Sequence, residues 1–256
     1  MSVASLPMYW RAENAHLWQA FWSVFQDCAA KEGLTAPDLT PPDALPASWA
    51  DHWQDPDLFV SMTCGLPFRT ALRNKVQYVG TFDFALNTQP GHYMSCVIRR
   101  SCPNGASPVA DMSGLRLAYN APDSQSGWAV TQLAAPFEHP PRFADICETG
   151  SHAQSLAAVA QGAADIAYID AVSWRILQRF DPNAAKVHLV GHSAVTPGLP
   201  LITARGTDPA PLRRALHAAT RAYSPQTPDD MGGPMTFCVL DARLYHAQPS
   251  PAPPGA

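Results

Sequence analysis

Charged residues are scarce in this sequence, and lysine is the scarcest of them. Asp, Glu, Lys and Arg make up 15% of the 256 residues, and the only lysines are Lys31, Lys75 and Lys186. The formal net charge is −4, and nowhere do basic residues form a block. Nucleic-acid binding usually requires a basic patch, so the composition argues against a nucleic-acid partner.

Long apolar runs are missing as well. A membrane-spanning helix needs about 20 consecutive, mainly apolar residues. The sequence holds no such run, so we expect no membrane insertion. The N-terminus contains neither the basic segment nor the apolar stretch of a secretory signal. We therefore expect a cytoplasmic protein as encoded, or a periplasmic one if the true start lies upstream.

Motifs for metals and common cofactors are absent too. The six cysteines form no Cys-x-x-Cys pair, and no Cys/His spacing resembles a zinc site. There is no Walker A loop and no dinucleotide-binding glycine fingerprint, so we expect no metal and no cofactor. Cys28, Cys64, Cys96 and Cys147 lie in apolar contexts, which favours buried free thiols, while the even count leaves disulfides open in an oxidising compartment.

What the sequence does contain is an alternation of strand-like and helical patterns. The apolar fraction of 46% can form a sizeable core, and the alternation predicts an α/β fold. Residues 88–188 carry a complete strand–helix set of their own, and residues 1–87 and 189–246 carry another. We expect a two-lobed protein whose second lobe is inserted in the first, with two crossing hinge strands and a disordered, proline-rich tail at 247–256.

One segment between a strand and a helix is rich in hydroxyl groups. Residues 119–128 read Tyr-Asn-Ala-Pro-Asp-Ser-Gln-Ser-Gly-Trp and lie between a predicted strand at 115–119 and a predicted helix at 124–135. The N-terminus of a helix has unpaired N–H groups and a partial positive charge, so serines there favour an anion site. An ordinary helix cap by Asp123 or Ser124 explains the same residues without a ligand.

Two more polar motifs follow predicted strands in the same part of the chain. Gly150-Ser151-His152 follows one of them, and Asp170 closes the next. Because parallel strands end at the same edge of a sheet, we expect these residues to lie near the serines. A lone histidine or aspartate at such a position is more often a cap, but the convergence favours a small-molecule site in a cleft between the lobes.

Several short sequence motifs occur in order along the chain, at residues 4–9, 63–68, 79–84, 93–95, 119–127, 148–152, 164–170 and 197–200. In sequence and spacing they resemble the PhnD-like family of phosphate, phosphite and phosphonate-binding proteins of ABC transporters. This family is a branch of the type II periplasmic binding proteins, and the resemblance covers nearly all of residues 3–205. It implies a receptor that closes on a small anionic ligand, works with an ABC permease and performs no catalysis.

The resemblance also implies which residues hold the ligand. Ser124, Gln125 and Ser126 map onto the turn that grips the oxyanion, where the family often has Ser-Thr-Ser, so Gln125 departs from the pattern. His152 maps onto a histidine that also contacts the anion. Asp170 maps onto an acidic residue that would hold a hydroxyl, an amine or a protonated oxygen.

Two aromatic residues complete the implied site. Tyr9 and Tyr93 map onto positions that stack on the organic part of the ligand or enclose it. Plain core packing explains both residues equally well. Gln125 and the tryptophans of the first lobe also leave room for other ligands. A receptor for alkanesulfonates or for thiamine-pyrimidine precursors is therefore an alternative.

Other functional classes remain open at this point. Gly191-His192-Ser193 follows a predicted strand and resembles the start of a nucleophile elbow, but Val195 stands where a glycine is needed. Ser126, His152 and Asp170 have the residue types of a catalytic triad, so a hydrolase is a less favoured alternative. A cytosolic binding protein that senses its ligand rather than transporting it is a further alternative.

Overall fold

The computed structural model describes residues 2–100, 112, 114–133 and 141–254, and they form two compact α/β units. Unit 1 consists of Met1–His92 and Pro197–Gln248, and unit 2 consists of Tyr93–Thr196 and Pro249–Ala256. The chain therefore returns to unit 1 after unit 2, as expected for an inserted lobe. The lobe boundaries predicted from the sequence, 87/88 and 188/189, lie close to these points and stay predictions.

Unit 1 is built on a five-stranded sheet in the order β1-β2-β11-β3-β12. Its strands are β1 (Val3–Ser5), β2 (Leu58–Met62), β3 (Val76–Asp83), β11 (Pro200–Ala204) and β12 (Thr236–Cys238). Strands β1 and β2 are parallel, whereas β11 and β12 are antiparallel to the strands they pair with. The α/β class predicted from the alternation of patterns is confirmed.

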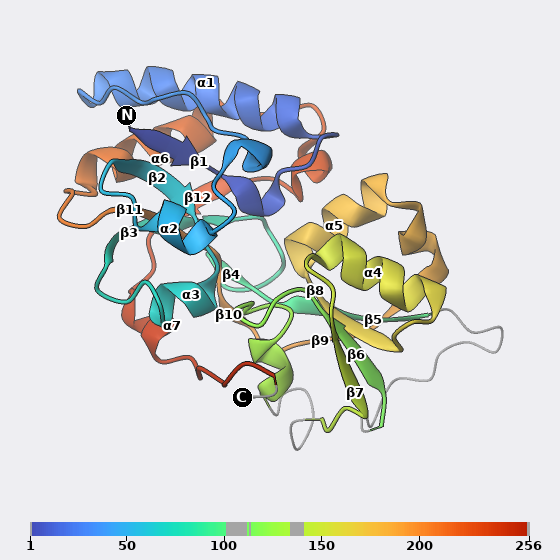
Figure 1. The fold of residues 1–256 in the computed structure, drawn as a ribbon. Helices are drawn as coiled ribbons and strands as arrows, with labels where there is room; N and C mark the ends of the chain where they lie inside the picture. The colour runs from blue at the N-terminus through green and yellow to red at the C-terminus, as the bar shows by residue number, and fades with distance from the viewer. Residues whose placement is uncertain (1, 101–111, 113, 134–140, 255–256) are drawn as a thin grey trace. The chain divides into compact units, whose positions relative to one another are not determined.

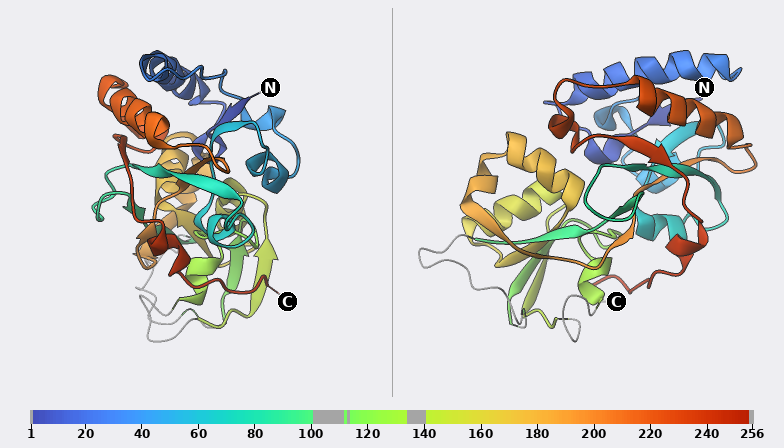
Figure 2. Two further views of the ribbon diagram at one scale, coloured as in Figure 1. Left: turned by 90° about the vertical axis from the view of Figure 1, so that its left-hand side faces the viewer. Right: turned by 180° about the vertical axis from the view of Figure 1, so that it is seen from behind.

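Two long helices lie side by side against this sheet (Figures 1 and 2). They are α1 (Ala15–Lys31) and α6 (Ala210–Ala222). Helix α1 buries Trp18, Phe21 and Phe25, which recur at helical spacing and form part of the core. The shorter elements of unit 1 are η1 (Pro7–Tyr9), η2 (Pro42–Ala44), α2 (Trp49–Trp53), α3 (Gly65–Arg69), η5 (Pro228–Met231) and α7 (Arg243–His246).

Unit 2 has its own five-stranded sheet in the order β7-β6-β8-β5-β9. The strands are β5 (Ser95–Arg100), β6 (Arg116–Tyr119), β7 (Asp145–Glu148), β8 (Ile166–Asp170) and β9 (Val187–His192). Strand β6 is parallel to both β7 and β8, so these three strands end at one edge. The separate strands β4 (His92–Tyr93) and β10 (Thr196–Pro197) pair with each other where the chain passes between the units.

Helices α4 (His152–Gln161) and α5 (Ala171–Phe180) cover one face of this sheet (Figure 1). Each follows directly on a strand of the parallel set, so both helices begin at the carboxyl edge of the sheet. Gly162 ends α4 at φ 82°, a left-handed conformation that favours glycine. The remaining elements are η3 (Ala129–Gln132) and η4 (Pro182–Lys186).

The helix predicted at 124–135 is wrong for the described residues. The backbone there forms wide turns and the short η3, because the N–H groups of Ala129 and Val130 donate to carbonyls five residues earlier, those of Ser124 and Gln125. Serine and glycine have low helix propensity, and a serine hydroxyl competes for nearby N–H groups. Residues 134 and 135 lie outside the described residues.

The expectation for the cysteines is only partly confirmed. Cys28 and Cys96 are buried free thiols, and burial raises the pKa of Cys96 to about 12. Cys64 is only partly buried, and Cys147 is exposed because it lies on β7, an edge strand whose residues are all exposed. In the described part of the chain, no helix is both long and apolar enough to cross a bilayer.

Candidate functional site

The serine turn, residues 120–128, follows β6 and folds back on itself. Ser124 Oγ accepts a hydrogen bond of 3.0 Å from the N–H of Gly127, and the Ser124 carbonyl accepts from the N–H of Trp128 at 3.2 Å. These bonds hold the two serine hydroxyls together, with 3.5 Å between Oγ of Ser124 and Oγ of Ser126. The turn is therefore a hydrogen-bonded loop that holds two hydroxyl groups close together, and not the first turn of an α-helix.

His152 connects this turn to the end of the neighbouring strand. Its Nε2 atom lies 2.9 Å from Oγ of Ser126, and the backbone N–H of Asp170 donates to the same Nε2 atom at 3.4 Å. The structure thus brings together Ser124, Ser126, His152 and Asp170 from the ends of three parallel strands, as the sequence predicted. The short distance arises because β6 lies between β7 and β8 in the sheet.

The imidazole of His152 is neutral at pH 7. Burial lowers its pKa to about 4. Because the Asp170 N–H already points at Nε2, this atom acts as an acceptor and the ring proton lies on Nδ1. The residue as a whole is half-buried, but its Nδ1 atom is enclosed and has no hydrogen-bond partner among the described residues.

This geometry differs from that of a Ser/His/Asp catalytic triad. In a triad the carboxylate accepts the proton of the second ring nitrogen and orients the imidazole. Here Oδ1 of Asp170 instead accepts from the N–H groups of Val172 and Ser173, at 2.8 and 3.1 Å, and caps α5. The ordinary capping role that the sequence offered for Asp170 is therefore present.

Ser193 has a structural role and does not resemble an exposed nucleophile. Its Oγ atom accepts from the N–H of Ser95 at 2.9 Å and donates to the carbonyl of Ala194 at 2.9 Å. Ser95 Oγ in turn donates to the carbonyl of Ser126 at 2.8 Å. Ser95 and Ser193 thus support the serine turn from β5 and the end of β9. Sequence reasoning missed this support, because a serine inside or beside a strand carries no special signal.

Asn120 and Gly127 form a second support that the sequence did not reveal. A Cβ atom built on Gly127 would overlap Oδ1 of Asn120 and lie 3.3 Å from its backbone nitrogen. Only glycine fits there while the Asn120 amide keeps its place. The Asn120 carbonyl also accepts from the N–H of Gly150 at 2.9 Å, which ties the serine turn to the segment that carries His152.

Gln125 and Tyr93 are both buried members of unit 2, with 2% and 3% of their surfaces exposed. Tyr93 belongs to β4, and the next residue, Met94, accepts through its carbonyl from the N–H of Ala171 at 3.0 Å. This bond places Tyr93 in the chain next to the start of α5. Contact of Gln125 and Tyr93 with a ligand stays a prediction.

Tyr9 belongs to unit 1. That it binds the same ligand as the residues of unit 2 also stays a prediction. The apolar run at residues 3–8 predicts a strand, but the observed strand ends at Ser5, and the η1 turn that carries Tyr9 follows. The Tyr9 carbonyl accepts from Nδ2 of Asn14 at 3.1 Å and from Nε1 of Trp18 at 3.3 Å. Its ring packs edge-on against Phe84, with 5.2 Å between centroids.

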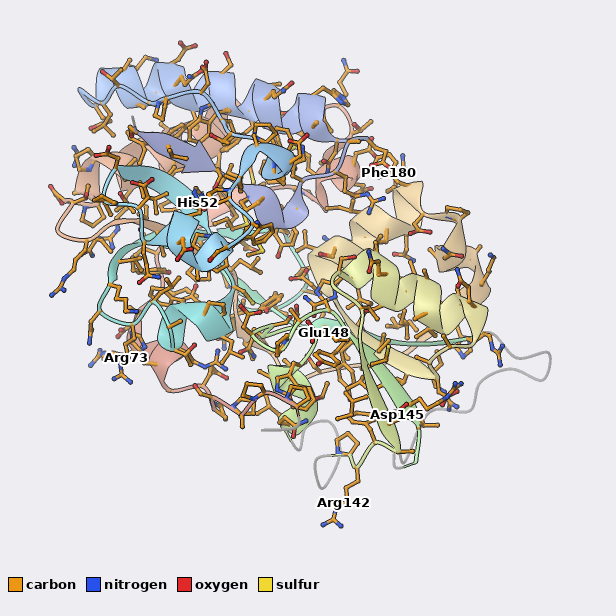
Figure 3. The ribbon with its side chains drawn as sticks, viewed as in Figure 1. His52, Arg73, Arg142, Asp145, Glu148 and Phe180 are labelled. Atoms are coloured by element: carbon orange, nitrogen blue, oxygen red, sulfur yellow. The ribbon has the colours of Figure 1, made fainter. Side chains whose placement is uncertain are left out.

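Acidic side chains flank the serine turn. Glu148 ends β7 (Figure 3), and its carboxylate accepts from the hydroxyl of Tyr119 at 3.3 Å. Burial, with the charge of Glu148 adding to it, raises the pKa of Asp123 within the turn. In the described part of the chain, no group of three or more His, Cys, Asp or Glu residues could hold a metal ion.

Comparison with known structures shows the fold. PhnD1 from Prochlorococcus marinus in complex with methylphosphonate has a TM-score of 0.69 at 11% identity, over 95% of this chain and 94% of that one. XAC2383 from Xanthomonas citri bound to ATP has a TM-score of 0.64 at 15% identity, over 95% and 94%. PA3383 from Pseudomonas aeruginosa, a binding protein component of an ABC phosphonate transporter, has 0.63 at 15% identity, over 93% and 81%. These matches confirm the type II periplasmic-binding-protein fold.

The sequence itself identifies the family. No curated protein matches it. Residues 70–232, more than half of the chain, match the sequence profile described as "ABC transporter, phosphonate, periplasmic substrate-binding protein". The chain therefore belongs to the phosphonate-binding family of periplasmic substrate-binding proteins of ABC transporters.

Proposed function

We propose that this protein captures a small oxyanion (phosphate, phosphite or a phosphonate) for ABC-type uptake or sensing, and that it performs no catalysis. The observation that carries the proposal is the hydrogen-bonded group of Ser126, His152 and the Asp170 N–H in a member of this family. The residues proposed to bind the ligand are Tyr9, Tyr93, Ser124, Gln125, Ser126, His152 and Asp170.

The hydrogen-bonding pattern supports binding of an anion by neutral donors. Ser124 Oγ already accepts from Gly127, so its proton is available to a ligand oxygen. The Ser126 hydroxyl donates to His152 in this structure, and a rotation about its C–O bond redirects the proton to an oxyanion. The N-terminus of α4, with its partial positive charge, lies at the same edge of the sheet.

Titration calorimetry tests the assignment. The panel holds phosphate, phosphite, methylphosphonate, 2-aminoethylphosphonate, sulfate, taurine and a thiamine pyrimidine. We expect a phosphorus oxyanion to bind, and Ser126→Ala or His152→Ala to weaken binding by about 1–3 kcal/mol, the usual loss for one hydrogen bond to a charged group. Ser23→Ala, on the exposed face of α1, is the matched control and should leave affinity unchanged.

The outcomes separate the candidates. Unchanged affinity in both site variants would show that the assigned residues are wrong even if the protein binds phosphonate. Binding of taurine or of the pyrimidine alone would replace the phosphorus ligand by one of the alternatives, with Gln125 as the residue that selects it. In a separate activity assay, turnover of a simple ester would contradict the assignment as a binding protein.

The compartment and the transport partner belong to the same proposal. The family is periplasmic and serves ABC transporters, so we infer an ABC permease as the partner. Fractionation of cells that express the native gene tests the location. Protein recovered only from the cytosol would favour a sensor, and protein recovered from the periplasm would favour uptake.

A further inference from the structure

The proline-rich end of the chain belongs to unit 2. The chain belongs to unit 1 from Pro197 to Gln248 and to unit 2 again from Pro249 onward. Of the described residues 249–254, four are proline, and none forms a helix or strand. This segment runs past η3 in all views (Figures 1 and 2). The family match ends at residue 232, so the segment lies outside the part that defines the family.

One hydrogen bond joins this tail to the serine turn. Nε1 of Trp128 donates to the carbonyl of Ala252 at 2.9 Å. Trp128 is only 6% exposed and packs with Tyr119, at 5.5 Å between ring centroids, in the core of unit 2. A buried indole N–H without an acceptor is costly, and the tail carbonyl supplies that acceptor.

The chemistry of the tail fits this contact. Proline has no N–H group and favours an extended polyproline II conformation, in which backbone carbonyls have no internal partner. Binding sites for such segments are lined by aromatic side chains, and a preformed extended chain loses little entropy when it binds. Here the indole of Trp128 donates to a carbonyl that lies between two prolines, Pro251 and Pro253.

We propose that the surface around Trp128 is a binding site for an extended proline-rich segment, and that residues 249–254 of the same chain occupy it. The occupied site stabilises the serine turn, because the backbone N–H of Trp128 donates to the Ser124 carbonyl at 3.2 Å. Trp128 thus links the tail on one side to the hydroxyl-bearing turn on the other. This inference does not depend on which ligand the turn binds.

Hydrogen exchange of indole N–H groups by NMR tests the proposal without any added anion. The chain has seven tryptophans, so the six others are internal controls for folding. In the full chain we expect the Trp128 indole N–H to exchange slowly. In a chain that ends at Gln248, it should exchange at least tenfold faster and shift its resonance, while the other indoles keep theirs. The backbone amides of residues 124–127 should lose protection with it.

Two further variants make the test decisive. A peptide of residues 248–256, added to the truncated chain, should restore the Trp128 resonance, and Trp128→Phe both assigns that resonance and abolishes peptide binding. If the truncated chain does not fold, the full-length chain with its prolines at 249, 251, 253 and 254 replaced by glycine should show faster exchange at Trp128.

Identical Trp128 exchange in the parent and the folded tail variants would overturn the binding site. Faster exchange at Trp128 with unchanged protection of residues 124–127 would overturn the link to the serine turn. Because no oxyanion is present, neither result depends on the outcome of the calorimetric panel.

Discussion

Each unit of this protein has a hydrogen-bonded serine–histidine pair among its described residues, and the two pairs have different surroundings. In unit 1, Oγ of Ser5 lies 2.7 Å from Nε2 of His52 (Figure 3) and 2.8 Å from Oγ of Ser61. In unit 2, Oγ of Ser126 lies 2.9 Å from Nε2 of His152. Burial lowers the pKa of both histidines. By distance and electrostatics alone, the two pairs are alike.

The two serine–histidine pairs differ in the backbone that surrounds the serine. Ser5 and Ser61 are paired across the parallel strands β1 and β2 and are completely buried, so the unit 1 pair fixes α2 to the sheet. Ser126 lies in a turn beyond the end of β6, beside a second hydroxyl and the start of α4. We therefore expect the unit 2 pair, and not the unit 1 pair, to contact a ligand, because Ser126 lies beyond the end of its strand, at the carboxyl edge of the sheet.

The largest expected effect comes from a substitution that changes the shape of the serine turn and leaves the unit 1 pair intact. Gly127→Ala places a methyl group on Oδ1 of Asn120 and forces the turn to move. We expect oxyanion affinity to fall by at least tenfold, about 1.4 kcal/mol or more. Asn120→Ala in the same chain removes the overlap and should restore most of the affinity. An unchanged affinity in Gly127→Ala would show that binding does not depend on this turn.

Removing one serine from each pair tests the assignment of roles. Ser5→Ala leaves the His52 ring without its hydroxyl partner in the core, so we expect the free energy of unfolding to fall by about 1–3 kcal/mol with ligand affinity unchanged. Ser126→Ala should do the reverse, weakening binding with little effect on stability. Urea denaturation and calorimetry on both variants measure the two effects. Equal losses of stability would mean that both pairs are structural.

The smallest expected effect is the pH dependence of stability caused by His152. Its pKa is about 4 in the folded protein and near the ordinary 6.5 in the unfolded chain. Above pH 6.5 the ring is neutral in both states and has no effect. As the pH falls from 6.5 to about 4, the unfolded chain binds a proton that the folded protein does not, so stability is lost.

We expect this loss to be about 1–2 kcal/mol, because the ring is only half-buried. The measurement is the free energy of unfolding of the parent and of His152→Gln across this pH range, with His52→Gln as the matched comparison from unit 1. A parent and His152→Gln that lose stability in parallel would contradict the neutral state assigned to His152.

Much of the fold could be predicted from local patterns. The apolar residues of α1 recur at helical spacing and predict a helix at 12–31, and the short apolar run of β8 predicts a strand at 165–170. Both elements are present nearly as predicted. The errors lie where side chains compete with the backbone. The helix expected from residue 124 fails because the Ser124 hydroxyl takes the N–H of Gly127, and the strand expected at 3–8 ends early because η1 begins at Pro7.

The sequence by itself determined the residue types at the strand ends, the family they belong to and the prediction that they meet at one edge. That much follows from short-range pattern, since strands, turns and capping residues are recognisable within a few positions. Only the tertiary structure decided that His152 is a neutral acceptor, that Asp170 caps α5, that Ser95, Asn120 and Ser193 support the serine turn, and that the Trp128 indole donates to the carbonyl of Ala252. These facts depend on burial and on hydrogen bonds between residues far apart in the chain, which no local pattern encodes.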